Sequence, residues 1–85
     1  MRVIAGEFRS RVLDEVDSIN TRETKDRVKE SIFNSISTDL YEATVLDLFS
    51  GSGSLGIESI SRGSISCDFV DKDRKAIDTV RKNIL

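Results

Sequence analysis

Residues 45–56 read VLDLFSGSGSLG, a short apolar run that leads directly into a glycine-rich turn. Glycine allows a tight turn at positive φ and lets a bound molecule approach the main chain closely. Residues 54–60 follow with the pattern of a helix, and the first N–H groups of a helix lack intrahelical partners. Strand, glycine turn and helix in this order predict the nucleotide-binding end of a Rossmann-like βαβ unit.

The turn matches the pattern G-x-G-x-x-G at Gly51, Gly53 and Gly56. Asp71 ends the next apolar run, about 20 residues after Gly51, where such a unit places an acidic residue. A carboxylate at that point can accept hydrogen bonds from both hydroxyls of a ribose. The spacing alone fits NAD, FAD and S-adenosylmethionine (SAM) equally well.

Asp47 separates these cofactors, because it lies near the end of the first strand and just before the glycine turn. A dinucleotide places its pyrophosphate beside this turn, and a buried carboxylate would repel that group. SAM instead carries an ammonium and a sulfonium, so an acidic side chain there favours SAM over NAD. The structural alternative is that Asp47 caps the turn and that the loop binds nothing.

The segments around the turn predict alternating helices and strands. Residues 2–5 and 8–13 flank Gly6-Glu7 and predict a β-hairpin, and residues 14–20 predict a loop. A helix is expected from an N-cap at Thr24 to near Thr38, with Asp26 favourably placed in its first turn. Its expected apolar face consists of Val28, Ile32, Phe33 and Ile36.

The second half of the chain predicts a βαβα unit with a right-handed crossover. We expect strands at 44–48 and 66–70, a helix at 54–62 closed by Gly63, and a helix at 73–84. Ala76, Ile77, Val80 and Ile84 form the expected apolar face of that last helix.

Length and composition limit the kind of protein. The 85 residues allow one small domain at most, and 38% hydrophobic with 33% charged residues is ordinary for a soluble globular chain. No apolar run approaches the roughly 20 residues that cross a bilayer, and residues 1–6 are too short for a signal peptide. One cysteine and no histidine exclude an internal disulfide and argue against a zinc site or a histidine-based triad. Cys67 reads as a small buried strand residue.

The net charge of −2 excludes a polycation, but residues 1–13 carry Arg2, Arg9 and Arg11 against Glu7 alone. This local surplus is compatible with contact to a phosphate backbone. Exposed arginines are also common on hairpins, so a solvated surface explains the same pattern.

Residues 20–34 read NTRETKDRVKESIFN, which is similar to the segment just before the cofactor strand in RsmD-type methyltransferases. These bacterial enzymes methylate the exocyclic N2 of a guanine in small-subunit ribosomal RNA. The opening residues 1–6 and the glycine turn resemble the same family, so the resemblance covers nearly the whole chain. The segment at 20–34 is far more specific than the turn, which many methyltransferases share.

The resemblance implies a site for SAM and a surface for RNA. Asp47, Phe49, Gly51 and Gly53 would shape the pocket for the methionine part, Asp71 would hold the ribose, and Lys72 would lie near the adenine. The methionine end would be closed by Thr21, Arg22, Thr24 and Arg27, with one arginine paired to the carboxylate of SAM. Arg27 could equally pair with Asp26 or Glu30 on the helix surface. Arg2, Arg9 and Arg11 of the hairpin would contact RNA.

One departure from the family is large. Its members carry a catalytic Asp/Asn-Pro-Pro-aromatic motif after a later strand, whereas this chain contains no proline. No catalytic residue is therefore assigned within the chain, and the strands that would complete the sheet are also absent. An open apolar strand edge is prone to pairing. We expect either the N-terminal portion of a longer enzyme or a chain that pairs with others.

The expected fold is therefore α/β: an incomplete Rossmann-like methyltransferase fold, with an N-terminal β-hairpin (residues 1–20) and the first part of a SAM-binding domain (21–85). The expected function is SAM-dependent methylation of guanine N2 in ribosomal RNA, free or in a small-subunit assembly particle, in the cytoplasm and without membrane contact. The 85 residues alone are expected to be inactive. The alternatives are a NAD-binding oxidoreductase fragment and a non-catalytic module that binds RNA or a partner.

Overall fold

The computed structural model describes residues 1–16 and 25–84, and helices alternate with strands along them. The order is α1 (Asp26–Leu40), β1 (Thr44–Leu48), α2 (Ser54–Ser61), β2 (Ser66–Val70) and α3 (Arg74–Ile84). This order confirms the predicted α/β class, and both strands have the predicted bounds. No helix in the described part of the chain is both long enough and apolar enough to span a bilayer.

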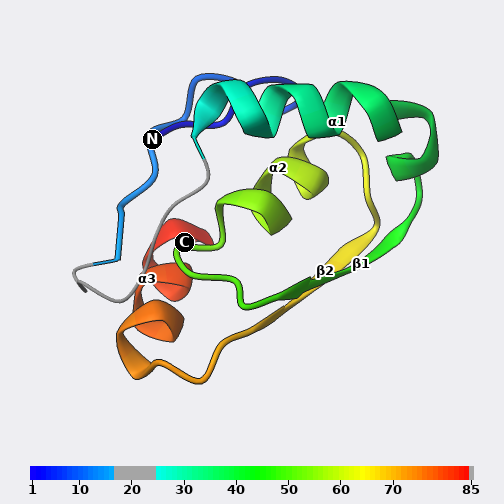
Figure 1. Cartoon of the computed structure of the whole chain (residues 1–85). Coiled ribbons are helices and arrows are strands. Elements are labelled where there is room, and N and C mark those ends of the chain that lie inside the picture. The colour runs from blue at the N-terminus through cyan, green and yellow to red at the C-terminus, as the bar shows by residue number, and fades with distance from the viewer. Residues whose placement is uncertain (17–24, 85) are drawn as a thin grey trace.

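The two strands form a parallel pair whose register runs from Thr44 beside Ser66 to Leu48 beside Val70. Parallel neighbours need a crossover, which α2 provides. α2 contacts both strands, α1 contacts α2, and α3 contacts β2. Figure 1 shows the resulting arrangement, with α2 lying between α1 and the strands.

The sheet has one covered and one open face within the described residues. Asp47 is buried on the face that α2 covers. On the opposite face Leu46, Leu48 and Val70 remain 62%, 55% and 44% exposed. Strands of an all-parallel sheet are normally covered on both faces, so this open face is a surface suited to further polypeptide.

The N-terminal segment (residues 1–16) is less regular than the predicted hairpin. Its only strand pairing among the described residues is an isolated antiparallel bridge between Arg2 and Val12. The physical reason lies in α2: the N–H groups of Ile4 and Ala5 donate to Glu58, and that of Phe8 donates to Ser61 Oγ. These donors are therefore unavailable for a ladder within the hairpin.

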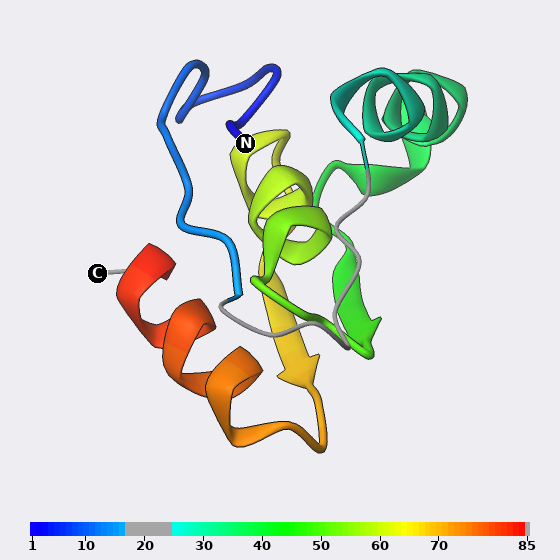
Figure 2. The same ribbon diagram turned by 60° about the vertical axis from the view of Figure 1, so that its left-hand side comes forward.

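Despite this irregular backbone, the N-terminal segment belongs to the core. Val3 and Leu13 are 1% and 3% exposed and cluster with Ile57 of α2. Farther along, the main chain of Asp14 exchanges two hydrogen bonds with Asn83 of α3. Figure 2 shows the segment running beside α2 toward α3. The segment is thus held against both helices.

α1 begins one residue later and ends about two residues later than predicted, and it presents a different face to the core. Its N-cap is Lys25, while the expected cap Thr24 lies outside the described residues. Of the predicted apolar face only Phe33 is buried, and Val28, Ile32 and Ile36 are 39–48% exposed. The predicted apolar face is therefore not the face that packs against the core, apart from Phe33. The helix is turned because the side chain of Lys29 points inward.

Lys29 and Glu58 are fully buried and, with Arg62, form what we call the buried charge cluster. Lys29 Nζ lies 3.6 Å from Glu58 Oε1 and donates to Arg2 O at 2.7 Å and to Ser54 Oγ at 2.9 Å. Glu58 also accepts from Arg62 Nε at 2.8 Å. Buried charges persist only where they are paired and hydrogen-bonded, and these groups satisfy that condition.

We predict that Lys29→Met strongly destabilises the chain. It leaves Arg2 O and Ser54 Oγ without their donor and removes one of the two cations beside Glu58, and breaking a buried pair costs about 3–5 kcal/mol. Urea denaturation followed by circular dichroism measures the change.

The matched control is Lys25→Met, which makes the same substitution at an exposed position one turn earlier. Its free energy of unfolding should change by no more than about 0.5 kcal/mol. Equal midpoints for the two variants would contradict a stabilising role for the buried charge cluster.

Candidate functional site

The glycine turn after β1 has an unusual backbone. Phe49, Gly51 and Gly53 have φ values of +61°, +57° and +86°. Ser50 N–H donates to Val70 O at 2.9 Å, and Gly53 N–H donates to Ser50 O at 2.9 Å. The turn is therefore tied both to the end of β2 and to itself. Positive φ in Phe49 is uncommon for a residue with a side chain, and such strain concentrates at functional sites.

Gly53 and Gly56 serve different purposes. Gly53 is the N-cap of α2 in the left-handed conformation, which glycine adopts without strain. A β-carbon on Gly56 would collide with the ring of Phe69 and with the sulfur of Cys67. Gly56 therefore allows α2 to approach β2 closely, as the last glycine of the pattern does in nucleotide-binding units.

Asp71 lies at the end of β2, as predicted, and its carboxylate faces the glycine turn. Oδ2 accepts from Gly51 N–H at 3.0 Å, and Oδ1 accepts from Asp73 N–H at 2.8 Å. A carboxylate offers about four acceptor positions, so both oxygens keep capacity for a further donor. The residue is partly exposed, which leaves it accessible to a ligand.

Asp47 is only 6% exposed, and its Oδ2 accepts from Gly56 N–H at 3.0 Å. The carboxylate thus lies beneath the turn and bonds to a backbone donor in the first turn of α2. A negative charge at a helix N-terminus is favourable. The structure therefore shows Asp47 capping this helix, and its negative charge lies directly behind the loop.

Cys67 lies beside this carboxylate on β2. Burial raises the pKa of its thiol, and the negative charge of Asp47 raises the pKa further. A raised pKa keeps the thiol protonated near neutral pH and makes it a poor nucleophile. An inert thiol fits a packing role, but Cys67 is partly exposed and not buried as predicted.

Ser50 is a site residue that the sequence analysis missed. It is 8% exposed, and its Oγ has no hydrogen-bond partner among the described residues. Buried hydroxyls are rarely left without a partner, and each such group calls for an explanation. The hydroxyl lies inside the glycine turn and therefore within the candidate site. No sequence pattern distinguishes it, because six other serines occur between residues 52 and 66.

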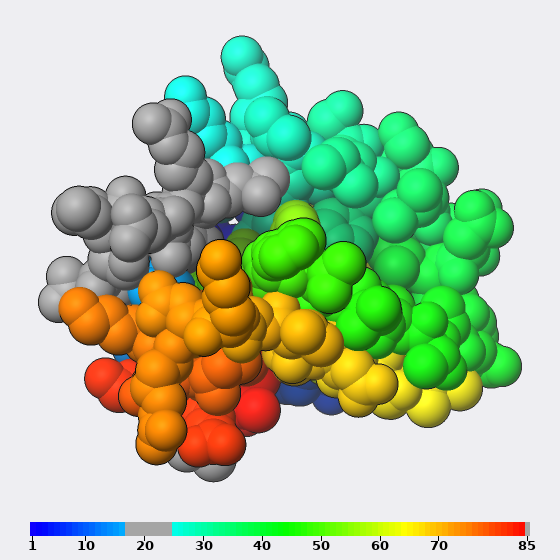
Figure 3. All heavy atoms as spheres, turned by 60° about the horizontal axis from the view of Figure 1, so that its bottom comes forward, coloured from blue at the N-terminus to red at the C-terminus, as the bar shows by residue number. Residues whose placement is uncertain are grey.

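Some of the other predicted site residues are exposed in the structure, and others lie outside the described residues. Phe49 is 76% exposed beside the turn, and Lys72 and Arg27 are also exposed. Thr21, Arg22 and Thr24 lie outside the described residues. Figure 3 shows the turn after β1, the end of β2 and the start of α3 at one surface. The described part of the candidate site is thus gathered at the carboxyl ends of the two strands.

Arg2, Arg9 and Arg11 are all exposed on the N-terminal segment. They differ in their surroundings, because Arg2 and Arg9 line a common cavity whose lining does not include Arg11. The structure therefore brings together two of the three arginines for which RNA contact was predicted.

Known proteins resemble the chain over almost its whole length. The "Putative rRNA methyltransferase YlbH" of Bacillus subtilis is 54% identical over 84 residues, covering 99% of this chain and 46% of that protein. The "Ribosomal RNA small subunit methyltransferase D" of Haemophilus influenzae is 39% identical over 84 residues, covering 99% and 44%. The solved structure of "Putative methyltransferase yhhF from Escherichia coli" has a TM-score of 0.88 at 36% identity, covering 99% and 44%.

The chain thus spans a little less than half the length of these relatives. The predicted resemblance to RsmD-type methyltransferases is confirmed, and the fold is the N-terminal portion of a methyltransferase fold. A family model described as "Conserved hypothetical protein 95" matches residues 1–85. The chain therefore belongs to that family.

Proposed function

We propose that this chain forms the cofactor-binding and RNA-contacting part of a methyltransferase. The enzyme would transfer a methyl group from SAM to guanine N2 of small-subunit ribosomal RNA. Relatives that are named ribosomal RNA methyltransferases support methyl transfer and ribosomal RNA as the substrate class. The single structural observation that carries the proposal is the position of the Asp47 carboxylate behind the glycine turn.

Asp47 favours SAM over a dinucleotide. A pyrophosphate at such a turn binds to free N–H groups at the helix N-terminus. Here Gly56 N–H already donates to Asp47, and the carboxylate places a negative charge directly behind the turn that the phosphates would face. The ammonium and sulfonium of SAM are instead attracted by that charge.

Other features of the turn fit the same cofactor. The buried Ser50 hydroxyl has no hydrogen-bond partner among the described residues, so it can bond to a ligand. Asp71 retains acceptor capacity for ribose hydroxyls. We assign the methionine part to Asp47, Phe49, Gly51 and Gly53 and the adenosine part to Asp71 and Lys72. Thr21, Arg22, Thr24 and Arg27 are proposed to close the methionine end.

SAM would supply an electrophilic methyl group, and the residues of this chain would bind and orient it. Asp71 would hold the ribose beside the glycine turn. The position of the turn would then determine the direction in which the methyl group points. Transfer is a displacement at carbon that depends mainly on positioning. We assign no residue of this chain to the orientation of the guanine amino group.

The remaining proposals concern location and partners. We propose that the protein acts in the cytoplasm on ribosomal RNA or on a small-subunit assembly particle. Residues 1–20 would serve the RNA and residues 21–85 the cofactor. The open sheet face at Leu46, Leu48 and Val70 would accept further polypeptide, from the same chain or from another.

We predict that Asp71→Asn in the intact protein weakens binding of S-adenosylhomocysteine by about tenfold or more, since hydrogen bonds to a charged group contribute about 1.5–3 kcal/mol each. Isothermal titration calorimetry measures the affinity. Asp68→Asn is the matched control, because Asp68 is exposed on the same strand and undergoes the same change of charge. Equal affinities for both variants would remove Asp71 from the site.

A second prediction separates a ligand-binding role of Ser50 from a structural one. Ser50→Ala should not lower the free energy of unfolding without ligand, because it removes a buried hydroxyl that has no partner. It should weaken binding of S-adenosylhomocysteine about fivefold or more, through loss of a hydrogen bond worth about 1 kcal/mol.

Ser64→Ala is the control for this experiment. Ser64 is also 8% exposed, but its Oγ donates to Ser59 Oγ at 3.4 Å. Its alanine variant should be destabilised by up to about 1 kcal/mol and should bind the ligand normally. A destabilised Ser50→Ala protein with unchanged affinity would show that the hydroxyl is structural.

The 85-residue chain by itself should transfer no methyl group to ribosomal RNA. It has no proline and therefore no Asp/Asn-Pro-Pro-aromatic segment to hold the guanine amino group. Incubation with radiolabelled SAM and small-subunit RNA tests this expectation. Incorporation above a heat-denatured control would mean that the 85 residues contain catalytic groups of their own.

A further inference from the structure

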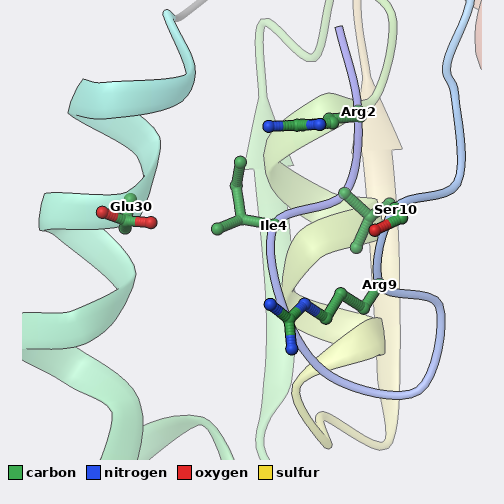
Figure 4. Close-up of a pocket in the computed structure, with 6 residues that line it drawn as sticks. Arg2, Ile4, Arg9, Ser10 and Glu30 are labelled. Carbon is green, nitrogen blue, oxygen red and sulfur yellow. The ribbon is translucent and has the colours of Figure 1, made fainter.

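A cavity of about 230 Å³ lies between the N-terminal segment and α1. It is lined by Arg2, Val3, Ile4, Arg9, Ser10 and Glu30, none of which belongs to the glycine turn. In Figure 4 the side chains of Arg2, Ile4 and Arg9 extend toward α1, with Ile4 between the two guanidinium groups. The cavity therefore combines two cations with a central apolar surface.

The two arginines remain available for a ligand. Arg2 Nε lies 4.0 Å from Asp26 Oδ2, and the Arg2 side chain is 65% exposed. Ion pairs at this distance and exposure contribute little to stability. Arg9 has no ion pair within 4.0 Å among the described residues. Neither guanidinium is committed to a strong internal partner.

Ser10 completes the lining from a constrained position. Its φ is +72°, and its N–H donates to Val3 O at 2.9 Å. This hydrogen bond fixes the residue in a left-handed conformation that side chains rarely adopt. A hydroxyl can donate to a phosphate oxygen, and strain of this kind is concentrated in ligand-binding segments.

We propose that this cavity binds one phosphodiester group of an unpaired RNA segment. Arg2 and Arg9 would hold the phosphate oxygens, and the adjoining ribose would pack against Ile4. The proposal rests on the ribosomal RNA substrate of the proposed function and adds that α1 forms one wall of the RNA site. The planar guanidinium fork matches phosphate geometry. Arg11 lies outside this site.

Glu30 identifies the kind of phosphate. The lining contains Arg2 and Arg9 against Glu30, a formal charge of +1. An internal phosphodiester carries one negative charge and matches this balance. A terminal or free phosphate carries about −1.5 to −2 at pH 7, and the nearby Glu30 carboxylate repels it more strongly. The cavity therefore favours the interior of an RNA strand over free phosphate.

Fluorescence anisotropy of the chain with a short single-stranded RNA tests the site. We expect Arg2→Ala and Arg9→Ala each to weaken binding about tenfold, as loss of a charge-assisted hydrogen bond implies. The control Arg81→Ala should weaken it less than about twofold, because it removes the same charge from an exposed position on α3 outside the cavity. The RNA affinity of Arg2→Lys should lie between those of the unmodified chain and Arg2→Ala, because lysine keeps the charge but lacks the planar guanidinium fork.

Two further readouts follow from shared binding of one phosphate. The double variant Arg2→Ala/Arg9→Ala should bind little worse than either single variant, since both residues serve the same group. Its plot of log affinity against log salt should be shallower by about 0.7, the value for one phosphate of a single strand. Thermal melts of each variant confirm that the fold is retained.

The carboxylate is tested separately. Glu30→Gln should strengthen RNA binding about threefold, since a like charge is removed from the lining. Glu7→Gln changes the net charge equally but lies outside the cavity, so it should have less effect. Inorganic phosphate should compete poorly with RNA for the unmodified chain.

Some outcomes would overturn the proposal. If Arg81→Ala weakens binding as much as Arg2→Ala and Arg9→Ala, the charge acts diffusely and no discrete site exists. If inorganic phosphate competes efficiently and the arginine variants abolish that competition, the cavity is a site for a free anion. Neither measurement uses a methyl donor, so failure of the SAM assignment would leave these results readable.

Discussion

The buried charge cluster holds the molecule together. The buried Glu58 carboxylate accepts main-chain donors from the N-terminal segment and pairs with a cation from α1 and with Arg62, the C-cap of α2. Removing Glu58 would leave two cations without their carboxylate, and removing Lys29 would take away one of the two cations that pair with it. The cluster thereby fixes where the N-terminal segment and α1 lie relative to α2. An apolar side chain in place of Glu58 could not accept hydrogen bonds from those backbone N–H groups. The irregular path of the N-terminal segment therefore depends on this carboxylate.

The same cluster reaches the candidate cofactor site. Lys29 donates to Ser54 Oγ at the first residue of α2, directly after the glycine turn. Its other donation, to Arg2 O, fixes the main chain of a residue that lines the proposed RNA cavity. One buried ammonium therefore contacts both regions. A substitution at Lys29 is expected to disturb cofactor and RNA binding together, even though the side chain is inaccessible to either ligand.

The sequence predicted those features that depend on local patterns and missed those that depend on packing. Strand bounds were correct because short apolar runs end at the glycine turn and at Asp71, where the local signals are strong. The helix–strand approach at Gly56 also follows from the motif. The buried positions of Lys29 and Glu58 could not be predicted, since a charged residue is ordinarily read as exposed. The exposure of Val28, Ile32 and Ile36 is the direct consequence of that inward Lys29. Ser50 could be singled out only after the atoms around its hydroxyl were known.

The length of α2 gives these contacts a functional meaning. Its eight residues span about 12 Å at 1.5 Å per residue. Its N-terminal half is bound by Asp47 and Lys29, behind and beside the glycine turn, while its C-terminal half binds the N-terminal segment through Glu58 and Ser61. A short rigid helix thus sets the separation between the proposed methyl-donor site and the proposed RNA site. Methyl transfer requires donor and acceptor to be held at a fixed distance and angle. A short helix held in place by buried ion pairs maintains such a distance better than a flexible linker could.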